Sequence, residues 1–229
     1  MIGHCLQRAR LASKVQEVYL ATCDQEIADY GRSIGVRVIM TSDSHRRAST
    51  RTAEALATIQ KLDPLNPIET VLMIQGDEPL ITPDSMSEVI EAFSDPTLSI
   101  VNLLSRIVDV ETFRDKNNVK TVIDSRGRVL YFSREPIPCD WTQEVAHRPL
   151  LQTGVIGFRV QALAEFNAMP ETSLEVIESI DMNRVLESGG VVNAVILERP
   201  TLGVDTRDEL ARAEALLRED AVTYRYIAR

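Results

Sequence analysis

Two carboxylates, Asp77 and Glu78, directly follow a short apolar segment of the sequence. That segment, residues 70–74, reads Thr-Val-Leu-Met-Ile, and such a β-branched run is typical of a buried strand in a parallel sheet. Acids placed after such a strand lie at the carboxyl edge of the sheet, where open α/β sheets bind their ligands. The alternative is an ordinary turn, because Gly76, Asp77 and Pro79 are common turn residues.

The overall charge of the chain argues against several classes of protein. The 229 residues include 34 acidic and 25 basic side chains, a formal net charge of -9, whereas nucleic-acid-binding proteins usually carry a basic excess. Cys5, Cys23 and Cys139 are odd in number and widely spaced, so we expect no disulfide framework and no zinc site. No apolar run is long enough to span a membrane. A cytoplasmic protein is therefore expected.

Strand and helix patterns alternate along the chain, which predicts an α/β fold. We expect one domain, residues 1–229, with a mostly parallel sheet flanked by helices and an antiparallel lobe inserted at roughly residues 128–160. A hairpin with Gly127 in its turn opens this lobe. The expected strands are residues 15–21, 36–40, 70–74, 99–104, 119–124, 128–132, 151–158 and 191–197, and the expected helices are 1–12, 25–34, 52–62, 82–93, 109–114, 160–168, 173–188 and 206–217.

Several well-known catalytic and nucleotide-binding patterns are absent from the sequence. It contains no GxGxxG after a strand and no GxxxxGK[ST], which argues against dinucleotide-binding oxidoreductases and P-loop NTPases. GxSxG and HExxH are also missing, so hydrolases that depend on those motifs have no support. Any phosphate-binding site in this chain must use another device.

Four stretches, in this order, resemble the 3-deoxy-manno-octulosonate (Kdo) cytidylyltransferases. They are QGDEPLI at residues 75–81, NVK at 118–120, YFSREPIP at 131–138 and GVDT at 203–206. The resemblance covers nearly the whole chain, and YFSREPIP is its most specific part. It implies a Rossmann-like nucleotidyltransferase fold and an enzyme that couples CMP from CTP to an acidic sugar, releasing pyrophosphate, for lipopolysaccharide synthesis. It also implies Mg²⁺ and a homodimer, whose contact surface we expect within residues 130–158.

The same resemblance implies roles for particular residues. Asp77 and Asp205 would be the catalytic residues that hold the metal, and Arg51 would bind the nucleotide. The residues implied for the sugar pocket are Gln75, Arg134, Gln152, Glu175 and Glu178.

Each of these roles has a structural alternative. Asp205 could cap the following helix together with Thr206, and Glu175 could close a capping box with Thr172. Arg134 could form a surface ion pair with Glu135.

The loop at residues 41–51 carries His45, Arg46, Arg47 and Arg51 ahead of a helix, where phosphate groups are attracted. For Arg46 and Arg47 we expect a solvated loop rather than a ligand contact.

Some positions depart from the family pattern. The family's first strand and its basic loop are not found in this sequence, so we expect the sheet to lack its central member and to keep unpaired backbone groups. Gln152 replaces the usual His, and Ile156 and Phe158 replace tyrosines. Because changed hydrogen-bonding groups alter specificity sharply, the acceptor is either Kdo or a related 2-keto-3-deoxy acid. Two alternatives stay open: a truncated or divergent non-catalytic homologue, and a nucleotidyltransferase for another base or sugar.

Overall fold

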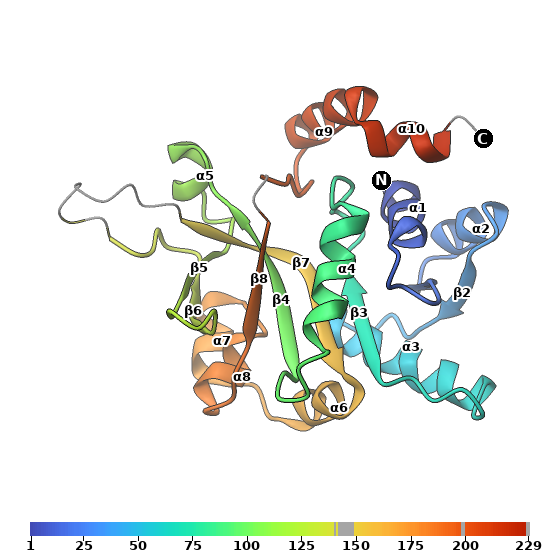
Figure 1. The fold of residues 1–229 in the computed structure, drawn as a ribbon, viewed down its shortest axis with the longest axis horizontal. Coiled ribbons are helices and arrows are strands. Elements are labelled where there is room, and N and C mark those ends of the chain that lie inside the picture. Colours follow the sequence, from blue (N-terminus) through green and yellow to red (C-terminus); the bar gives the residue numbers. More distant parts are fainter. Residues whose placement is uncertain (140, 142–148, 198–199, 228–229) are drawn as a thin grey trace.

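The strands form two separate sheets in the computed structural model, which describes residues 1–139, 141, 149–197 and 200–227. In the smaller sheet, β1 (Tyr19–Thr22) pairs in parallel with β2 (Arg37–Met40). The larger sheet has six strands, ordered β6-β5-β7-β4-β8, with β3 paired to β7 (Figure 1). These strands are β3 (Thr70–Ile74), β4 (Ile100–Arg106), β5 (Lys120–Ile123), β6 (Val129–Ser133), β7 (Leu150–Arg159) and β8 (Asn193–Leu197).

Strand β7 organises the larger sheet because it pairs with three other strands. It runs antiparallel to β4, to β3 through its second half and to β5 near its start. The expected parallel arrangement holds for β1 with β2 and for β4 with β8, whereas β7 makes the larger sheet mixed. Antiparallel neighbours need no crossover helix, and the described residues between β5 and β7 contain none.

Helices cover both faces of the larger sheet. The helices of the described residues are α1 (Ile2–Leu11), α2 (Gln25–Ser33), α3 (Ala48–Leu62), α4 (Pro83–Ala92), α5 (Val110–Arg114), α6 (Val160–Ala168), α7 (Ser173–Glu178), α8 (Asn183–Glu187), α9 (Arg207–Glu219) and α10 (Ala221–Ile227). The expected single helix at residues 173–188 is two helices, because Ser179 ends α7 in the left-handed conformation with φ 55°. Among the described helices, none combines the length and apolar character that crossing a membrane requires.

The alternation of side chains along β4 explains how the two faces are packed. Ile100 and Leu104 face a cluster that includes Phe132 of β6, Phe158 of β7 and residues of α6 and α8. The alternate β4 residues, Val101 and Leu103, face a second cluster built with α1 and α4. Since successive strand residues point to opposite faces, β4 is buried on both sides and lies in the middle of the core (Figure 1).

Strands β1 and β3 each keep one edge without a strand partner. Within the described residues, β1 pairs with β2 alone and β3 pairs with β7 alone. The expected gap in the sheet is therefore present, and it separates the two sheets.

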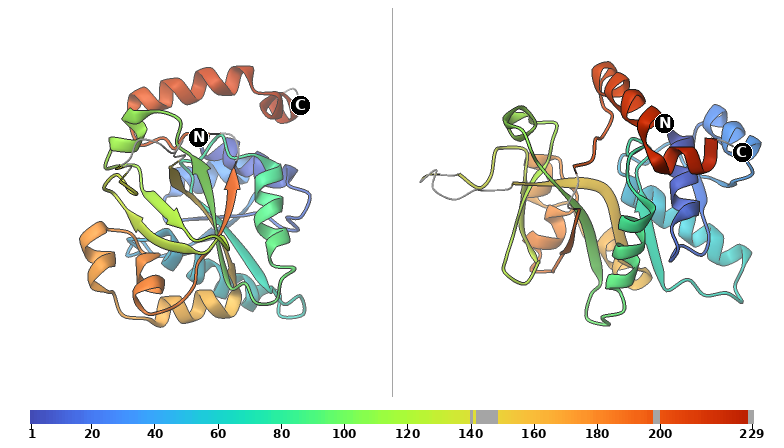
Figure 2. Two further views of the ribbon diagram at one scale, coloured as in Figure 1. Left: turned by 60° about the vertical axis from the view of Figure 1, so that its left-hand side comes forward. Right: turned by 45° about the horizontal axis from the view of Figure 1, so that its top comes forward.

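A buried arginine in α1 joins the two terminal helices. The Arg8 side chain is fully buried, and its guanidinium binds the Asp220 carboxylate and donates to Thr223 Oγ1 at 3.0 Å. It also lies 3.4 Å from the carbonyl oxygens of Leu80 and Ile81, in the segment after β3. Figure 2 shows α10 lying close to the start of α1. Arg8 thus connects the C-terminal helices to the segment that carries Asp77.

We expect the Asp220→Asn substitution to lower the free energy of unfolding by roughly 3 kcal/mol. Removing one partner of a buried ion pair leaves the other charge uncompensated, and Asp220 is partly exposed, which places the loss near the lower end of the usual range. Urea denaturation would measure it. The matched control is Glu214→Gln in the exposed Arg218–Glu214 pair, which should cost below about 0.5 kcal/mol. Equal losses in both variants would contradict a role for the Arg8 pair.

Candidate functional site

A cavity of about 1810 Å³ opens where β3 ends. Its wall includes the predicted site residues Gln75, Asp77, Arg51, Arg134, Gln152 and Asp205. The cavity continues between the two sheets, where residues of β1 and β3 line it. Six side chains predicted from distant parts of the sequence are thus brought to one site.

Asp77 and Glu78 form the acidic wall of this cavity. The Oδ1 atom of Asp77 is buried without a hydrogen-bond partner, and burial together with the nearby Asp205 carboxylate raises the pKa of Asp77. Glu78 accepts a hydrogen bond from the Gly154 backbone N–H at 2.7 Å through Oε1, whereas its Oε2 is buried without a partner. Burial, with the neighbouring Asp77 and Asp205 charges, raises the pKa of Glu78 to about 7. Unpaired buried oxygens are costly, so this wall is built for a ligand with positive charge or donors.

The Asp205 carboxylate is free to act in the site. The cap of α9 is Thr206, which forms a capping box with Glu209, so the alternative role of Asp205 as a helix cap is wrong. No described residue donates to its side chain, and Asp205 is exposed. Its neighbour Val204 donates to the Asp77 carbonyl oxygen at 3.0 Å, which ties the two acidic segments together.

The donor set at the acidic wall suits a hard cation that is shared with a substrate. The described residues contain no group of three or more His, Cys, Asp and Glu side chains that could hold a metal by themselves. Mg²⁺ is usually bound by one or two carboxylates with water and substrate phosphates. The unpartnered Asp77 oxygen and the free Asp205 carboxylate match that requirement.

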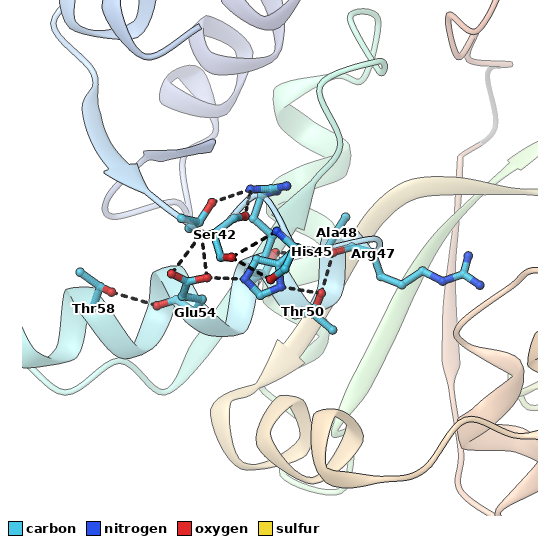
Figure 3. Close-up of polar contacts among 11 residues, drawn as sticks. Ser42, His45, Arg47, Ala48, Thr50, Glu54 and Thr58 are labelled. Atoms are coloured by element: carbon cyan, nitrogen blue, oxygen red, sulfur yellow. Dashed lines mark hydrogen bonds and ion pairs between the residues drawn. The ribbon is translucent and has the colours of Figure 1, made fainter. Parts of the chain in front are cut away.

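Hydrogen bonds fold the loop that precedes α3 back onto the helix (Figure 3). His45 bonds to Thr50 Oγ1 at 3.0 Å through Nδ1 and to the Glu54 carboxylate through Nε2. Glu54 also accepts from the Ser42 backbone N–H at 3.1 Å. The hydrogen bonds from His45 and Ser42 lower the pKa of Glu54. His45 is therefore a structural residue of the loop.

Two arginines of this loop are held in place. Arg51 donates to Thr41 Oγ1 at 2.6 Å and to the Ser42 carbonyl at 3.1 Å through Nη1, while the side chain lines the cavity. Arg47 donates to the Ser179 carbonyl at 3.1 Å and points away from the loop toward α7 (Figure 3). Arg47 thus joins the loop to the end of α7 through an exposed hydrogen bond, and its expected lack of a ligand contact stays a prediction.

Arg134 is held by backbone carbonyls and not by an acid. Its Nε donates to the Glu178 carbonyl at 2.7 Å and its Nη1 to the Lys116 carbonyl at 2.9 Å. Glu135, the expected surface partner, binds Lys116 instead. Since Arg134 lines the cavity and no described residue accepts from its Nη2 atom, it keeps donor capacity for an anionic ligand.

Glu178 supports the YFSR segment and does not line the cavity. Its carboxylate accepts from Ser133 Oγ at 2.7 Å, from Tyr131 Oη at 3.2 Å and from the Arg134 backbone N–H at 2.8 Å. Partial burial acts to raise its pKa, but these hydrogen bonds hold the pKa below its usual range. Glu178 therefore fixes the YFSR segment, and its expected contact with the sugar stays a prediction.

Glu175 is a core residue. It is fully buried, and its carboxylate forms two hydrogen bonds with Arg184, at 2.6 and 2.7 Å. The Arg184 guanidinium also stacks over the Phe166 ring at 4.7 Å. Both the expected sugar contact and the capping box with Thr172 are wrong, since the buried arginine takes the whole carboxylate.

The Gln75 side chain lies against Gly154 of β7, two residues along the strand from Gln152. A Cβ atom at Gly154 would lie 2.7 Å from the Cβ of Gln75, so that only glycine allows this approach. The Gln75 backbone N–H donates to the Gly154 carbonyl at 2.9 Å, and the Gln152 N–H donates to the Val119 carbonyl at 2.8 Å. Both glutamines line the cavity.

Sequence reasoning missed Lys120, a fully buried residue of β5. Its Nζ donates to the carbonyls of Asp115 at 2.7 Å and Asn118 at 2.6 Å, and burial lowers the pKa of Lys120. The loop that it fixes lines the cavity through Asn117 and Asn118. The NVK motif signalled this role, because a lysine within an apolar strand needs buried partners.

Comparison with known proteins agrees with this geometry. Residues 1–198 match the family model described as cytidylyltransferase. The chain is 34% identical over 223 residues to the 3-deoxy-manno-octulosonate cytidylyltransferase of Thermodesulfovibrio yellowstonii, covering 95% of this chain and 88% of the relative. It is 33% identical over 223 residues to the mitochondrial enzyme of that name from Arabidopsis thaliana, covering 96% of this chain and 74% of the relative. The solved structure of a CMP:2-keto-3-deoxy-manno-octonic acid synthetase complexed with CTP superposes with a TM-score of 0.85 at 29% identity, covering 95% of this chain and 87% of that one.

The Glu78→Gln substitution should remove a pH-dependent part of the stability. Since the folded-state pKa of Glu78 is raised from 4.5 to about 7, its contribution is complete below pH 4.5 and is lost as the pH rises through 7. At about 1.4 kcal/mol per pKa unit, this group should cost the wild type about 3 kcal/mol of its free energy of unfolding between pH 4 and pH 8. The variant lacks the group and should not show this loss. Urea denaturation without divalent cations would measure this, and parallel curves for the two chains would disprove it.

The Glu175→Gln substitution should lower the free energy of unfolding by roughly 3–5 kcal/mol, the range for breaking a buried ion pair. Glu165→Gln, on the exposed face of α6, is the matched control and should change it by below about 0.5 kcal/mol. If Glu175→Gln kept wild-type stability and weakened ligand binding instead, Glu175 would be a binding residue.

Proposed function

Because this chain belongs to the cytidylyltransferase family and is related along nearly its whole length to 3-deoxy-manno-octulosonate cytidylyltransferases, we propose that it transfers CMP from CTP to Kdo or a related 2-keto-3-deoxy acid and releases pyrophosphate. The chain is an enzyme with a nucleotidyltransferase fold. The observation that carries the proposal is the acidic wall: an unpartnered, buried Asp77 oxygen beside the free Asp205 carboxylate. A lipopolysaccharide precursor would be the product, made in the cytoplasm.

The proposed reaction depends on charge neutralisation and alignment. A sugar hydroxyl attacks the α-phosphate of CTP, the new P–O bond forms, and the bond to the pyrophosphate oxygen breaks. The hydroxyl proton leaves with solvent or a phosphate oxygen. Asp77 and Asp205 would hold Mg²⁺, which when bound would offset the negative charge of the phosphates. Their place at the end of β3 and at the start of α9 lets both carboxylates face one substrate.

The loop at residues 41–51 is proposed as the nucleotide-binding element. Arg51 lines the cavity while Thr41 and Ser42 fix one of its nitrogen atoms, so the guanidinium is positioned before a nucleotide arrives. The N-terminus of α3, at Ala48, also lines the cavity and favours phosphate groups. Positioning of this kind is what a phosphoryl transfer needs from the protein.

The opposite part of the cavity is proposed to bind the acidic sugar. Arg134 supplies donors for the sugar carboxylate, a group that arginine binds well through two parallel hydrogen bonds. Gln75 and Gln152 supply the amide groups for sugar hydroxyls. Glu178 contributes by fixing the backbone of Arg134.

A homodimer is proposed on the antiparallel lobe, residues 128–160. Leu130 of β6 is 59% exposed and Trp141 is 89% exposed. Large apolar side chains that reach solvent on one lobe suit a protein–protein contact. The acidic net charge gives no support for a nucleic-acid partner.

Pyrophosphate release from CTP in the presence of Mg²⁺ and Kdo tests the proposal. We expect the full chain to release pyrophosphate, and the Asp77→Asn variant to lose at least about 100-fold in kcat, since it removes a carboxylate proposed to hold the Mg²⁺ that offsets the phosphate charge. Asp84→Asn, an exposed acid in the first turn of α4, is the matched control and should keep wild-type activity.

Other outcomes of this assay would change the proposal. Release with UTP equal to that with CTP would mean a different base specificity, and release with another acid sugar alone would replace Kdo as the acceptor. A folded chain without release for any of these substrates would support a non-catalytic homologue.

A further inference from the structure

Asn102, a fully buried residue of β4, occupies an irregular part of the larger sheet. The β4–β7 register shifts here: Asn102 lies opposite Ile156, whereas Leu104 lies opposite Gln152. Residues 153–155 of β7 therefore form a bulge opposite Leu103. Bulges leave backbone groups unpaired and often lie beside functional sites.

The carboxamide of Asn102 satisfies the bulge in one orientation. Its Nδ2 atom lies 3.0 Å from the Val155 carbonyl, 3.1 Å from the Leu103 carbonyl and 3.3 Å from the Thr153 carbonyl. The reversed carboxamide would place its oxygen against three carbonyl oxygens, which cannot donate. The nitrogen must therefore face the bulge, and Oδ1 must face the other way.

The orientation of Asn102 decides the orientation of Gln152. The Nε2 atom of Gln152 donates to Asn102 Oδ1 at 2.8 Å. Because Oδ1 can only accept, the end of Gln152 that faces it must be the nitrogen. The Gln152 oxygen, Oε1, then has no donor among the described residues, and the side chain lines the cavity.

We propose that Asn102 is a positioning residue that holds Gln152 so that its Oε1 atom accepts a hydrogen bond from a hydroxyl of the acidic sugar. The inference rests on the proposed function and adds a determinant of acceptor specificity. A sugar with a hydroxyl at this point can donate a hydrogen bond to the Gln152 Oε1 atom. A keto or carboxylate oxygen at the same point cannot donate and would face that acceptor oxygen without a hydrogen bond. Sites built for a hydroxyl discriminate strongly against analogues that lack it.

A double-mutant cycle separates this role from support of the bulge. We expect Gln152→Leu and Asn102→Ser each to raise the KM for the sugar by roughly tenfold and to leave the KM for CTP unchanged. If Asn102 acts through Gln152, the double variant should match Gln152→Leu alone to within about twofold. The inference would be overturned if the increases in sugar KM of the two single variants multiplied in the double variant. It would also be overturned if the KM for CTP rose as much as the KM for the sugar.

Thr153→Val is the matched control for damage to the bulge. Thr153 donates to the Leu103 carbonyl at 2.7 Å in the same bulge, and among the described residues no hydrogen bond joins its hydroxyl to the Gln152 side chain. This variant should have a lower Tm with a sugar KM within about twofold of wild type. A rise in sugar KM equal to that of Asn102→Ser would assign the effect to the bulge and overturn the inference.

A second measurement needs no change at Asn102. Sugar analogues with each hydroxyl in turn replaced by hydrogen or by fluorine, which cannot donate a hydrogen bond, should show one position where both replacements weaken wild-type turnover roughly tenfold. In the Gln152→Leu variant, replacing the hydroxyl at that position should cause no additional loss of turnover. Equal sensitivity of the wild type and the variant at every position would overturn the inference. Absence of both turnover and sugar binding in the wild type would overturn the proposed function and this inference together, whereas wild-type turnover with a failed cycle would overturn the inference alone.

Discussion

The pairing of β7 with three strands is the constraint on which the site depends. β7 pairs with β3 as far as Ile74↔Val155 and with β4 as far as Asn102↔Ile156. Beyond the latter pair, residues 153–155 of β7 bulge away from β4. The Gly154 carbonyl still accepts from the Gln75 backbone N–H, which continues the β3–β7 ladder, whereas the Gly154 backbone N–H donates to the Glu78 carboxylate. A regular ladder would use this N–H between strands. The irregularity therefore links the acidic wall to the sugar side of the cavity.

Buried polar groups separate the scaffold from the working parts of the molecule. Asn102, Lys120 and the Glu175–Arg184 pair are buried and hydrogen-bonded. Asp77 and Glu78 are the two acidic side chains, among the residues that the structure describes, that keep a buried carboxylate oxygen without a partner. Folding alone gives no reason for that arrangement, because an unpaired polar atom costs free energy. A ligand that supplies charge or donors gives such a reason, and the family's phosphoryl chemistry provides one.

Positions at element ends were predictable from the sequence, whereas roles of charged side chains often were not. The β3 strand followed by Asp77 and the hairpin turn at Gly127 were predicted and are present, because each depends on neighbouring residues. Glu175 and Glu178 were predicted to bind sugar, but partners from other segments occupy both. Sequence spacing shows that two acids share a helix face and cannot show what that face meets.

By itself, the sequence determined the α/β class, the family and the residues that converge on the cavity, since local patterning and motifs carry that information. The tertiary structure alone decided the mixed sheet around β7 and the orientation of Gln152 through Asn102. These features arise from pairings between residues about 30 positions or more apart. The free energy of such a contact depends on how deeply its polar groups are buried and on which of them find a hydrogen-bond partner. A single stretch of the chain determines neither.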